Sequence, residues 1–127
     1  MHHSRLCTLC LDCQDGDLAA ASAFWSAALG KPVETTDEDG DGKYAALETA
    51  RDELRILLQR VDHPSRVHLD IETDDLEAEA ARLEALGAKR IAFVHDRWWV
   101  MEAPTGHRFC VVGRQGDIFG PHLNRWE

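Results

Sequence analysis

Two ten-residue stretches, Leu9-Cys-Leu-Asp-Cys-Gln-Asp-Gly-Asp-Leu18 and Val67-His-Leu-Asp-Ile-Glu-Thr-Asp-Asp-Leu76, decide the fold, because they repeat one pattern at a constant offset of 58 residues. Each alternates along its first half, as a strand with one buried face does, and then runs into an acidic turn. An alanine-rich stretch follows each copy, from Asp17 to Leu29 and from Asp75 to Leu86, and each ends at Leu-Gly. The chain is therefore predicted to contain two modules that each open with a strand and a helix.

The two predicted helices have suitable ends, and the second has a clear apolar side. Short carboxylates that can accept the amide protons of a first turn precede the helices: Asp15 or Asp17, and Asp74 or Asp75. Gly30 and Gly87 suit the left-handed position after a last turn, where a Cβ atom would clash. The apolar side of the second helix consists of Leu76, Ala80, Leu83 and Leu86, and its polar side of Glu77, Glu79 and Glu84. This helix is predicted to lie on a sheet with its glutamates facing out.

Three strand-like segments follow each helix. They are Val33 to Thr36, Tyr44 to Glu48 and Leu54 to Val61 in the first copy, and Arg90 to Val94, Trp98 to Glu102 and His107 to Val112 in the second. Residues 44–58 also include good helix formers, so a helix is the alternative there, but the repeat favours strands. The order βαβββ, twice, predicts an α+β fold with modules at about 5–62 and 66–113. Residues 114–127 are predicted to be an irregular tail that docks through Phe119 and Trp126.

Length and composition predict one domain that covers residues 1–127. The chain is 44% hydrophobic and 29% charged, which is typical of a globular protein, and it has no apolar run long enough to span a membrane. The formal charge of −9, with acids and bases interspersed, argues against a nucleic-acid partner. The first residues lack the apolar core of a secretory signal, so we expect a cytoplasmic protein whose four cysteines are free thiols.

Four short motifs resemble a known superfamily. They are Phe24-Trp25-Ser-Ala-Ala-Leu-Gly30, His68-Leu-Asp-Ile-Glu-Thr-Asp-Asp-Leu76, Leu86-Gly-Ala88 and Ala103-Pro-Thr-Gly-His-Arg-Phe-Cys-Val-Val112. In this order and spacing they resemble the glyoxalase-like branch of the glyoxalase/bleomycin-resistance/dioxygenase (vicinal oxygen chelate) superfamily. The resemblance implies paired βαβββ modules whose curved mixed sheets enclose a cavity, with helices on the outer faces, and often a homodimer. Metal-using members hold one divalent ion through one residue from the first strand and one from the last strand of each module; metal-free members bind or sequester small molecules.

The resemblance also implies a set of candidate metal ligands. Because a strand sends alternate side chains to opposite faces, Val67, Leu69 and Ile71 are predicted to pack under the helix, as are their counterparts Leu9, Leu11 and Cys13. His68 stands where the resemblance places a ligand histidine, and Cys10 is its counterpart in the first module. The last-strand position falls at or beside Cys110, with a counterpart near Leu57 or Gln59, so both glutamates usual in the family are missing. The candidate ligands are therefore Cys10, His68, Cys110 and Gln59.

Two interpretations of this set stay open. Thiolate and imidazole are the ligands that zinc prefers, so one interpretation is a zinc site with an open position for water or substrate. In the other, the cavity has lost its metal and Cys10 and Cys110 are small wall residues. His68 would then be the candidate catalytic acid or base, with Asp12 or Asp70 to orient it. The candidate substrate-binding residues are Asp12, Asp70, Arg55, Arg108 and Trp98, in which the arginines would hold an anionic group and Trp98 or Trp99 would form an aromatic wall.

Two further motifs predict different metal chemistry. Asp37-Glu-Asp-Gly-Asp-Gly-Lys-Tyr-Ala-Ala-Leu-Glu48 matches the EF-hand calcium loop, but no helix is predicted to enter it, which favours a solvated acidic loop between strands. Cys7, Cys10 and Cys13 have the spacing that opens an iron–sulfur ligand run, but its continuation is absent and a strand aims Cys10 away from the other two.

The sequence thus leaves three functions open. The first is a small-molecule enzyme of lyase or isomerase type that acts in the cavity between the modules. The second is a non-catalytic protein of the bleomycin-resistance type that binds or sequesters a small molecule, and the third is a calcium-binding protein that uses Asp37 to Glu48. The predicted partners are a small-molecule ligand and a second copy of the chain, and the predicted cofactor is either none or a single divalent metal.

Overall fold

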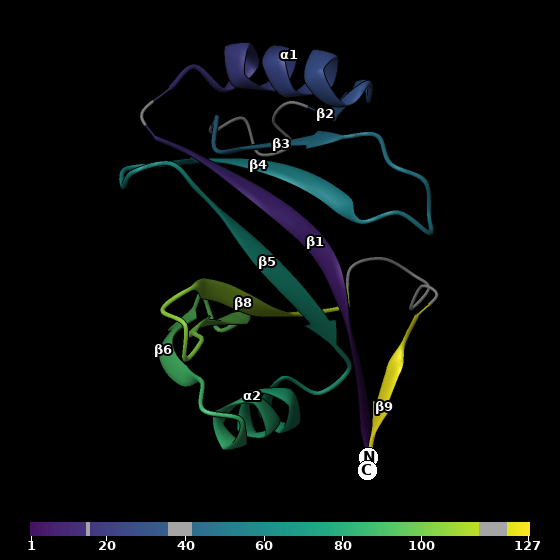
Figure 1. The fold of residues 1–127 in the computed structure, drawn as a ribbon, viewed down its shortest axis with the longest axis vertical. Helices are drawn as coiled ribbons and strands as arrows, with labels where there is room; N and C mark the ends of the chain where they lie inside the picture. The colour runs from purple at the N-terminus through teal and green to yellow at the C-terminus, as the bar shows by residue number, and fades with distance from the viewer. Residues whose placement is uncertain (15, 36–41, 115–121) are drawn as a thin grey trace. The chain divides into compact units, whose positions relative to one another are not determined.

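The computed structural model of the chain describes residues 1–14, 16–35, 42–114 and 122–127 (Figure 1). The first module consists of β1 (His2–Gln14), α1 (Leu18–Leu29), β2 (Val33–Thr35), β3 (Tyr44–Leu47) and β4 (Arg55–Val61). The second consists of β5 (Arg66–Thr73), α2 (Leu76–Ala85), β6 (Lys89–Val94), β7 (Trp98–Glu102) and β8 (Arg108–Gly113), and β9 (Asn124–Trp126) follows it. The predicted α+β fold with the order βαβββ twice is confirmed. No helix among the described residues is long and apolar enough to cross a membrane.

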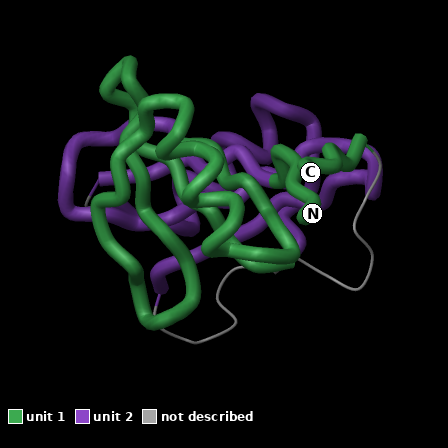
Figure 2. The backbone as a smooth tube through the Cα atoms, turned by 90° about the horizontal axis from the view of Figure 1, so that it is seen from below, with its two compact units in different colours: residues 1–7, 68–127 green, residues 8–67 purple. Residues whose placement is uncertain are grey.

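The chain forms two compact units that do not coincide with the predicted modules (Figure 2). Unit 2 is residues 8–67, and unit 1 is residues 1–7 together with 68–127. The first strand is therefore longer than expected: β1 begins at His2, and its residues up to Cys7 belong to the unit that contains the second module. The hydrophobic pattern of the repeat could not predict this start, since it begins only at Leu9.

Unit 2 contains a mixed sheet in the order β2-β3-β4-β1, in which β1 and β4 run parallel. Its core consists of Leu11, Leu18, Ala45, Leu47 and Leu58. Leu9 and Cys13 pack against this core, so the predicted inward face of the first strand is confirmed. Residues 44–47 and 55–61 are strands, as the repeat predicted, and the alternative of a helix there is wrong.

Unit 1 contains the strand order β1-β5-β8-β7-β6, in which β5 and β8 run parallel and β9 pairs antiparallel with β1. Its core consists of Ala80, Leu83, Met101 and Val111, with Ile71, Trp99 and Phe109 packed against it. Leu69, predicted to be buried, is 43% exposed, and Val67, at the end of unit 2, is 52% exposed. The reason is that α2 packs mainly on β6, β7 and β8, so that on β5 only Ile71 reaches the apolar cluster.

The helix ends follow the predicted chemistry. The carboxylate of Asp17 accepts from the amide of Ala19 at 2.9 Å, and that of Asp75 accepts from the amide of Ala78 at 3.0 Å. Gly30 adopts the left-handed φ of 69°, which favours glycine because a Cβ atom would clash there. Position 15 lies outside the described residues.

Two side chains of α2 differ from the amphipathic prediction. Leu86, expected in the apolar face, is 67% exposed, because the helix ends at Ala85 and the chain turns away. Glu79, expected to face solvent, is fully buried. Its partners are His2, far away in sequence on β1, and Arg82 on the next turn of α2.

The predicted irregular tail contains the short strand β9. Trp126 pairs with His2 in the ladder between β9 and β1 and is half-buried, as expected for a docked side chain. Phe119, the other predicted docking residue, lies outside the described residues.

Candidate functional site

The sheet of unit 1 has one apolar face and one polar face. Ile71, Val111 and Trp99 face α2, and therefore their neighbours on β5, β8 and β7 point to the opposite face. The register places Asp70 opposite Cys110 and Cys110 opposite Val100. This second face is called the polar face below, and its members on β5 and β8 are His68, Asp70, Glu72, Arg108 and Cys110.

Three chemically different donors converge on the polar face. Ligand atoms of His68, Asp70 and Cys110 all lie within 4.8 Å of one another. The side chains of His68 and Asp70 are only 12% and 14% exposed. Nε2 of His68 is 3.3 Å from Oδ1 of Asp70, near enough for an ion pair if the imidazole is protonated, but Oδ1 is buried and accepts no hydrogen bond from the described residues.

The buried carboxylate oxygen gives a test of whether this set fits a metal ion. A buried carboxylate oxygen that accepts no hydrogen bond is unfavourable unless another group interacts with it, and a bound cation would do so. Imidazole nitrogen, carboxylate oxygen and thiol sulfur are all ligands of zinc, and three protein ligands are typical of catalytic zinc sites. The residues of the polar face therefore fit a divalent ion. Asp70 was predicted to bind substrate and not metal; its position two residues from His68 on one strand is the signal that places it in the set.

The backbone of Asp70 is held by β1. The thiol of Cys7 donates to the carbonyl oxygen of Asp70 at 3.4 Å, and Nε of Arg5 donates to the buried carboxylate of Glu72 at 3.1 Å. Both contacts come from the part of β1 that belongs to unit 1. They fix the strand segment that carries the donor set.

Arg108 and Trp98 lie on the same face of the sheet as His68, Asp70 and Cys110. Arg108 lies two residues from Cys110, and its Nε is 3.7 Å from a carboxylate oxygen of Glu102. Trp99 packs on the α2 side, where its ring centroid lies 4.8 Å from that of Phe93. Trp98 therefore belongs to the polar face, where it contacts the ring of His95.

The remaining candidates lie in unit 2. Sγ of Cys10 is 3.7 Å from Oδ1 of Asp12 and 3.9 Å from Oε1 of Gln59, and both Cys10 and Asp12 are buried. The amide of Gln59 also donates to the hydroxyl of Tyr44 at 3.4 Å. Arg55 is exposed at the start of β4. Within unit 2, Cys10 thus lies near Gln59, and within unit 1, His68 lies near Cys110.

The calcium motif and the cysteine run gain no support as sites. Residues 36–41 of the calcium motif lie outside the described residues, but residues 44–47 form β3 and not the helix that follows an EF-hand loop. Cys13 packs against the core of unit 2, whereas Cys10 contacts Asp12 and Gln59 on the other side of β1. These two thiols therefore face apart, as the strand predicted.

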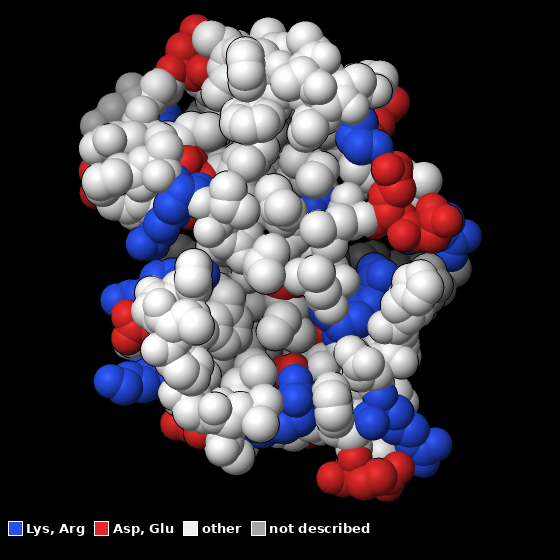
Figure 3. Space-filling model, in the orientation of Figure 1, with Lys and Arg blue, Asp and Glu red and all other residues white. Residues whose placement is uncertain are grey.

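Charged side chains are interspersed on the face of the molecule in Figure 3, where lysines and arginines lie next to acidic residues. In unit 1, Arg90 binds both carboxylate oxygens of Glu77 and one of Glu84, at 2.6 to 2.9 Å. These hydrogen bonds lower the pKa of Glu77.

The order of helices and strands, βαβββ twice, is that of the vicinal oxygen chelate fold. Residues 8–112 match the family model described as a glyoxalase-like domain, and the chain belongs to this family. The resemblance inferred from the four motifs is thereby confirmed. A comparison with curated proteins finds no match.

Solved structures share the fold at low sequence identity. A hypothetical protein from Bacillus halodurans is 13% identical with a TM-score of 0.66, over 91% of this chain and 97% of that one. The Mn(II)-bound glyoxalase from Novosphingobium aromaticivorans is 21% identical with a TM-score of 0.57, over 87% of this chain and 40% of that one. A variant of homoprotocatechuate 2,3-dioxygenase from B. fuscum is 18% identical with a TM-score of 0.60, over 93% of this chain and 34% of that one. The chain thus spans well under half the length of these two enzymes.

Proposed function

We propose that this chain is a metal-dependent enzyme of lyase or isomerase type that acts on a small molecule at the polar face of unit 1. The observation that carries the proposal is the buried Oδ1 of Asp70, which lacks a hydrogen-bond donor and lies among the ligand atoms of His68 and Cys110. Relatives with this fold include a glyoxalase that binds Mn(II) and a dioxygenase, which supports an enzymatic role.

Zinc is the ion that the donor set of this chain favours. A thiolate is a soft ligand that selects zinc, whereas manganese prefers carboxylates and water. When bound, such an ion supplies a Lewis acid that polarises a carbonyl oxygen. His68, Asp70 and Cys110 would hold it, which gives the buried carboxylate a partner.

The neighbouring side chains would position the substrate. The guanidinium of Arg108 presents several donors in one plane and suits a carboxylate or phosphate, which would exchange with its long contact to Glu102. Trp98 and Val100 give the same face an apolar surface. The arrangement favours a substrate with an anionic group and an apolar part.

Metal analysis tests the proposal. Protein purified without chelator should bind one zinc per chain, and Cys110→Ser, Asp70→Asn and His68→Ala should each lower its affinity by more than about 100-fold. Cys13→Ser is the matched control, because this thiol packs in the core of unit 2 and should leave metal binding unchanged. In the cobalt-substituted protein, the sulfur-to-metal charge-transfer band should disappear in Cys110→Ser and remain in Cys13→Ser.

Other outcomes would overturn parts of the proposal. Stoichiometric zinc that survives Cys110→Ser and Asp70→Asn would exclude this ligand set, and a chain that binds no divalent metal would exclude the metal-dependent function. Cys10→Ser and Gln59→Ala test the sequence-based prediction that the first module also supplies ligands. Turnover in a panel of small carbonyl compounds should be lost in His68→Ala; binding without turnover in the unaltered protein would favour sequestration.

A further inference from the structure

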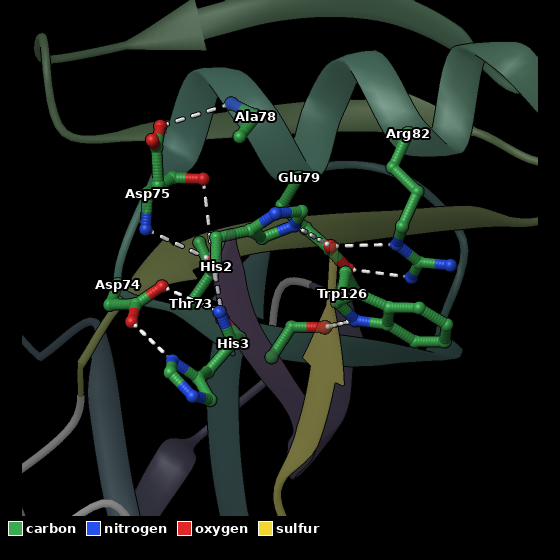
Figure 4. A network of polar contacts seen from close by, with 10 residues as sticks. His2, His3, Thr73, Asp74, Asp75, Ala78, Glu79, Arg82 and Trp126 are labelled. Carbon is green, nitrogen blue, oxygen red and sulfur yellow. Dashed lines mark hydrogen bonds and ion pairs between the residues drawn. The ribbon is translucent and has the colours of Figure 1, made fainter.

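A buried glutamate of α2 binds groups from two other elements of unit 1 (Figure 4). The side chain of Glu79 is 0% exposed. Nε2 of His2, on β1, lies 2.8 Å from Oε1 of Glu79, and it donates because an ionised carboxylate only accepts. Arg82, on the same helix, donates from Nε to Oε1 at 2.9 Å and from Nη2 to Oε2 at 2.8 Å. Glu79, which is itself fully buried, therefore binds the side chains of His2 and Arg82, which are 10% and 24% exposed.

Strand β9 is held by residues that are themselves bound to Glu79. The indole Nε1 of Trp126 donates to the hydroxyl oxygen of Ser4 at 2.8 Å, and this hydroxyl in turn donates to the carboxylate of Glu79. The guanidinium carbon of Arg82 lies 3.8 Å from the centroid of the Trp126 ring, which is a cation–π contact. Ser4 and Arg82, which both contact Trp126, thus each bind the carboxylate of Glu79. Figure 4 shows the indole, Arg82 and Glu79.

We propose that Glu79 is an acid-sensitive latch, which in its ionised form docks β9 and the N-terminal end of β1 on α2 and which releases β9 when it is protonated. Protonation turns one carboxylate oxygen from an acceptor into a donor, and the carboxyl can then no longer accept from Arg82, His2 and Ser4 together. Arg82 would then be left beside a neutral group without its counter-charge, and its side chain is only 24% exposed, which is unfavourable.

The electrostatics of Glu79 set the direction of the effect. Burial alone would raise its pKa, but the hydrogen bonds from Arg82, His2 and Ser4 outweigh burial and hold the pKa below its ordinary value. A carboxyl whose pKa is lowered in the folded protein stabilises the docked state above its unfolded pKa. This stabilisation is lost as the pH falls through the folded pKa, so release occurs in acid and not at neutral pH.

The other charged groups near the latch are already paired within their own elements or with each other. Arg125 and Glu127, which flank Trp126, lie 3.2 Å apart and are exposed. The carboxylate of Asp74, at the end of β5, accepts from the backbone amide and from Nδ1 of His3, each at 2.8 Å. Among the charged groups of the described residues around it, Glu79 is the one that is fully buried.

Nuclear magnetic resonance of the indole N–H groups tests the latch. The chain has four tryptophans, and the signal of Trp126 is identified as the one that is missing in Trp126→Phe. We expect this signal to change in one transition whose midpoint lies below the ordinary pKa of a glutamate, while the far-ultraviolet circular dichroism of the chain is retained. In Glu79→Gln the signal should already be at its released position at pH 7.

Two further variants keep the test decisive. Glu77→Gln is the matched control, because Glu77 is an exposed carboxylate of the same helix with its own arginine partner, Arg90, and the variant should titrate as the unaltered chain does. His2→Gln replaces the imidazole, whose hydrogen bond helps to lower the pKa of Glu79, so the transition should move to higher pH. A Trp126 signal that is unchanged in Glu79→Gln, or, if that variant does not fold, a midpoint that is unchanged in His2→Gln, would overturn the proposal.

Discussion

The two modules place side chains at equivalent positions but fill them with different chemistry. Asp12 pairs in register with Gln59, and Asp70 pairs in register with Cys110. Two residues before each aspartate, the first module has Cys10 and the second has His68. Both modules have an aspartate at this position, but the possible metal ligands beside the aspartate differ. The repeat therefore fixes where a polar group stands, whereas the residue type at each position decides what the group can bind.

The environments of the two aspartates differ as well. Oδ1 of Asp12 lies 3.7 Å from the thiol of Cys10, and Oδ2 lies 3.7 Å from Nε of Arg66. Oδ1 of Asp70, in contrast, is buried and accepts no hydrogen bond. The second module thus offers the less satisfied carboxylate, which is why the proposed metal site is placed there.

The largest effect is expected for substitutions in the two cores. If the two modules are packed equally well, such substitutions should lower the unfolding free energy by similar amounts. Leu58 in unit 2 and Met101 in unit 1 are both 0% exposed. Replacing either with alanine removes buried methylene groups and leaves a cavity, so each variant should lose about 2 to 5 kcal/mol of unfolding free energy, measured by urea denaturation. Leu29→Ala, at a site that is 45% exposed, should lose far less. A loss below about 1 kcal/mol for only one core residue would show that its module is packed more loosely.

An exchange of donors between the modules should have the next largest effect. Cys110→Gln gives the second module the residue of the first at this position, and zinc affinity should fall by more than about 100-fold, because an amide replaces a thiolate. His68→Cys also copies the first module, but a thiolate is itself a zinc ligand, so affinity should fall by about 10-fold or less. Both affinities can be measured by competition with a chromophoric chelator. If His68→Cys loses as much affinity as Cys110→Gln, the thiol preference inferred for the site is wrong.

The sequence predicted the elements well because local chemistry determines them. Aspartate before each helix, glycine after it and alternation along the strands all act over a few residues, and the boundaries of α1, α2 and β7 follow them closely. The repeat resolved the one ambiguous segment, residues 44–61, because its counterpart had to be strands.

The incorrect predictions have causes that are not local in sequence. Glu79 has the spacing of a solvent-facing residue, and its burial depends on His2 and Trp126, which are 77 and 47 residues away in sequence. Leu69 alternates correctly but lies where α2 does not cover the sheet. Asp70 was not among the predicted ligands because the family pattern takes one ligand from the first strand of each module, and His68 filled that position. For Glu79 and Leu69 the cause is which element lies over a face, and periodicity carries no information on that.

The smallest expected effect concerns the helix starts, where the modules should behave alike. Asp17 and Asp75 each accept a hydrogen bond from an amide of the first turn, and neither cap relies on a distant partner for this bond. Alanine at either position should lower the unfolding free energy by about 1 kcal/mol, and the two losses should agree within about 0.5 kcal/mol. Asparagine retains the acceptor, so Asp17→Asn and Asp75→Asn should lose much less in the same urea experiment. A loss above about 2 kcal/mol for Asp75→Ala alone would show that this carboxylate stabilises more than the first turn of α2. In that case the start of α2, and not its cap alone, would distinguish the second module from the first.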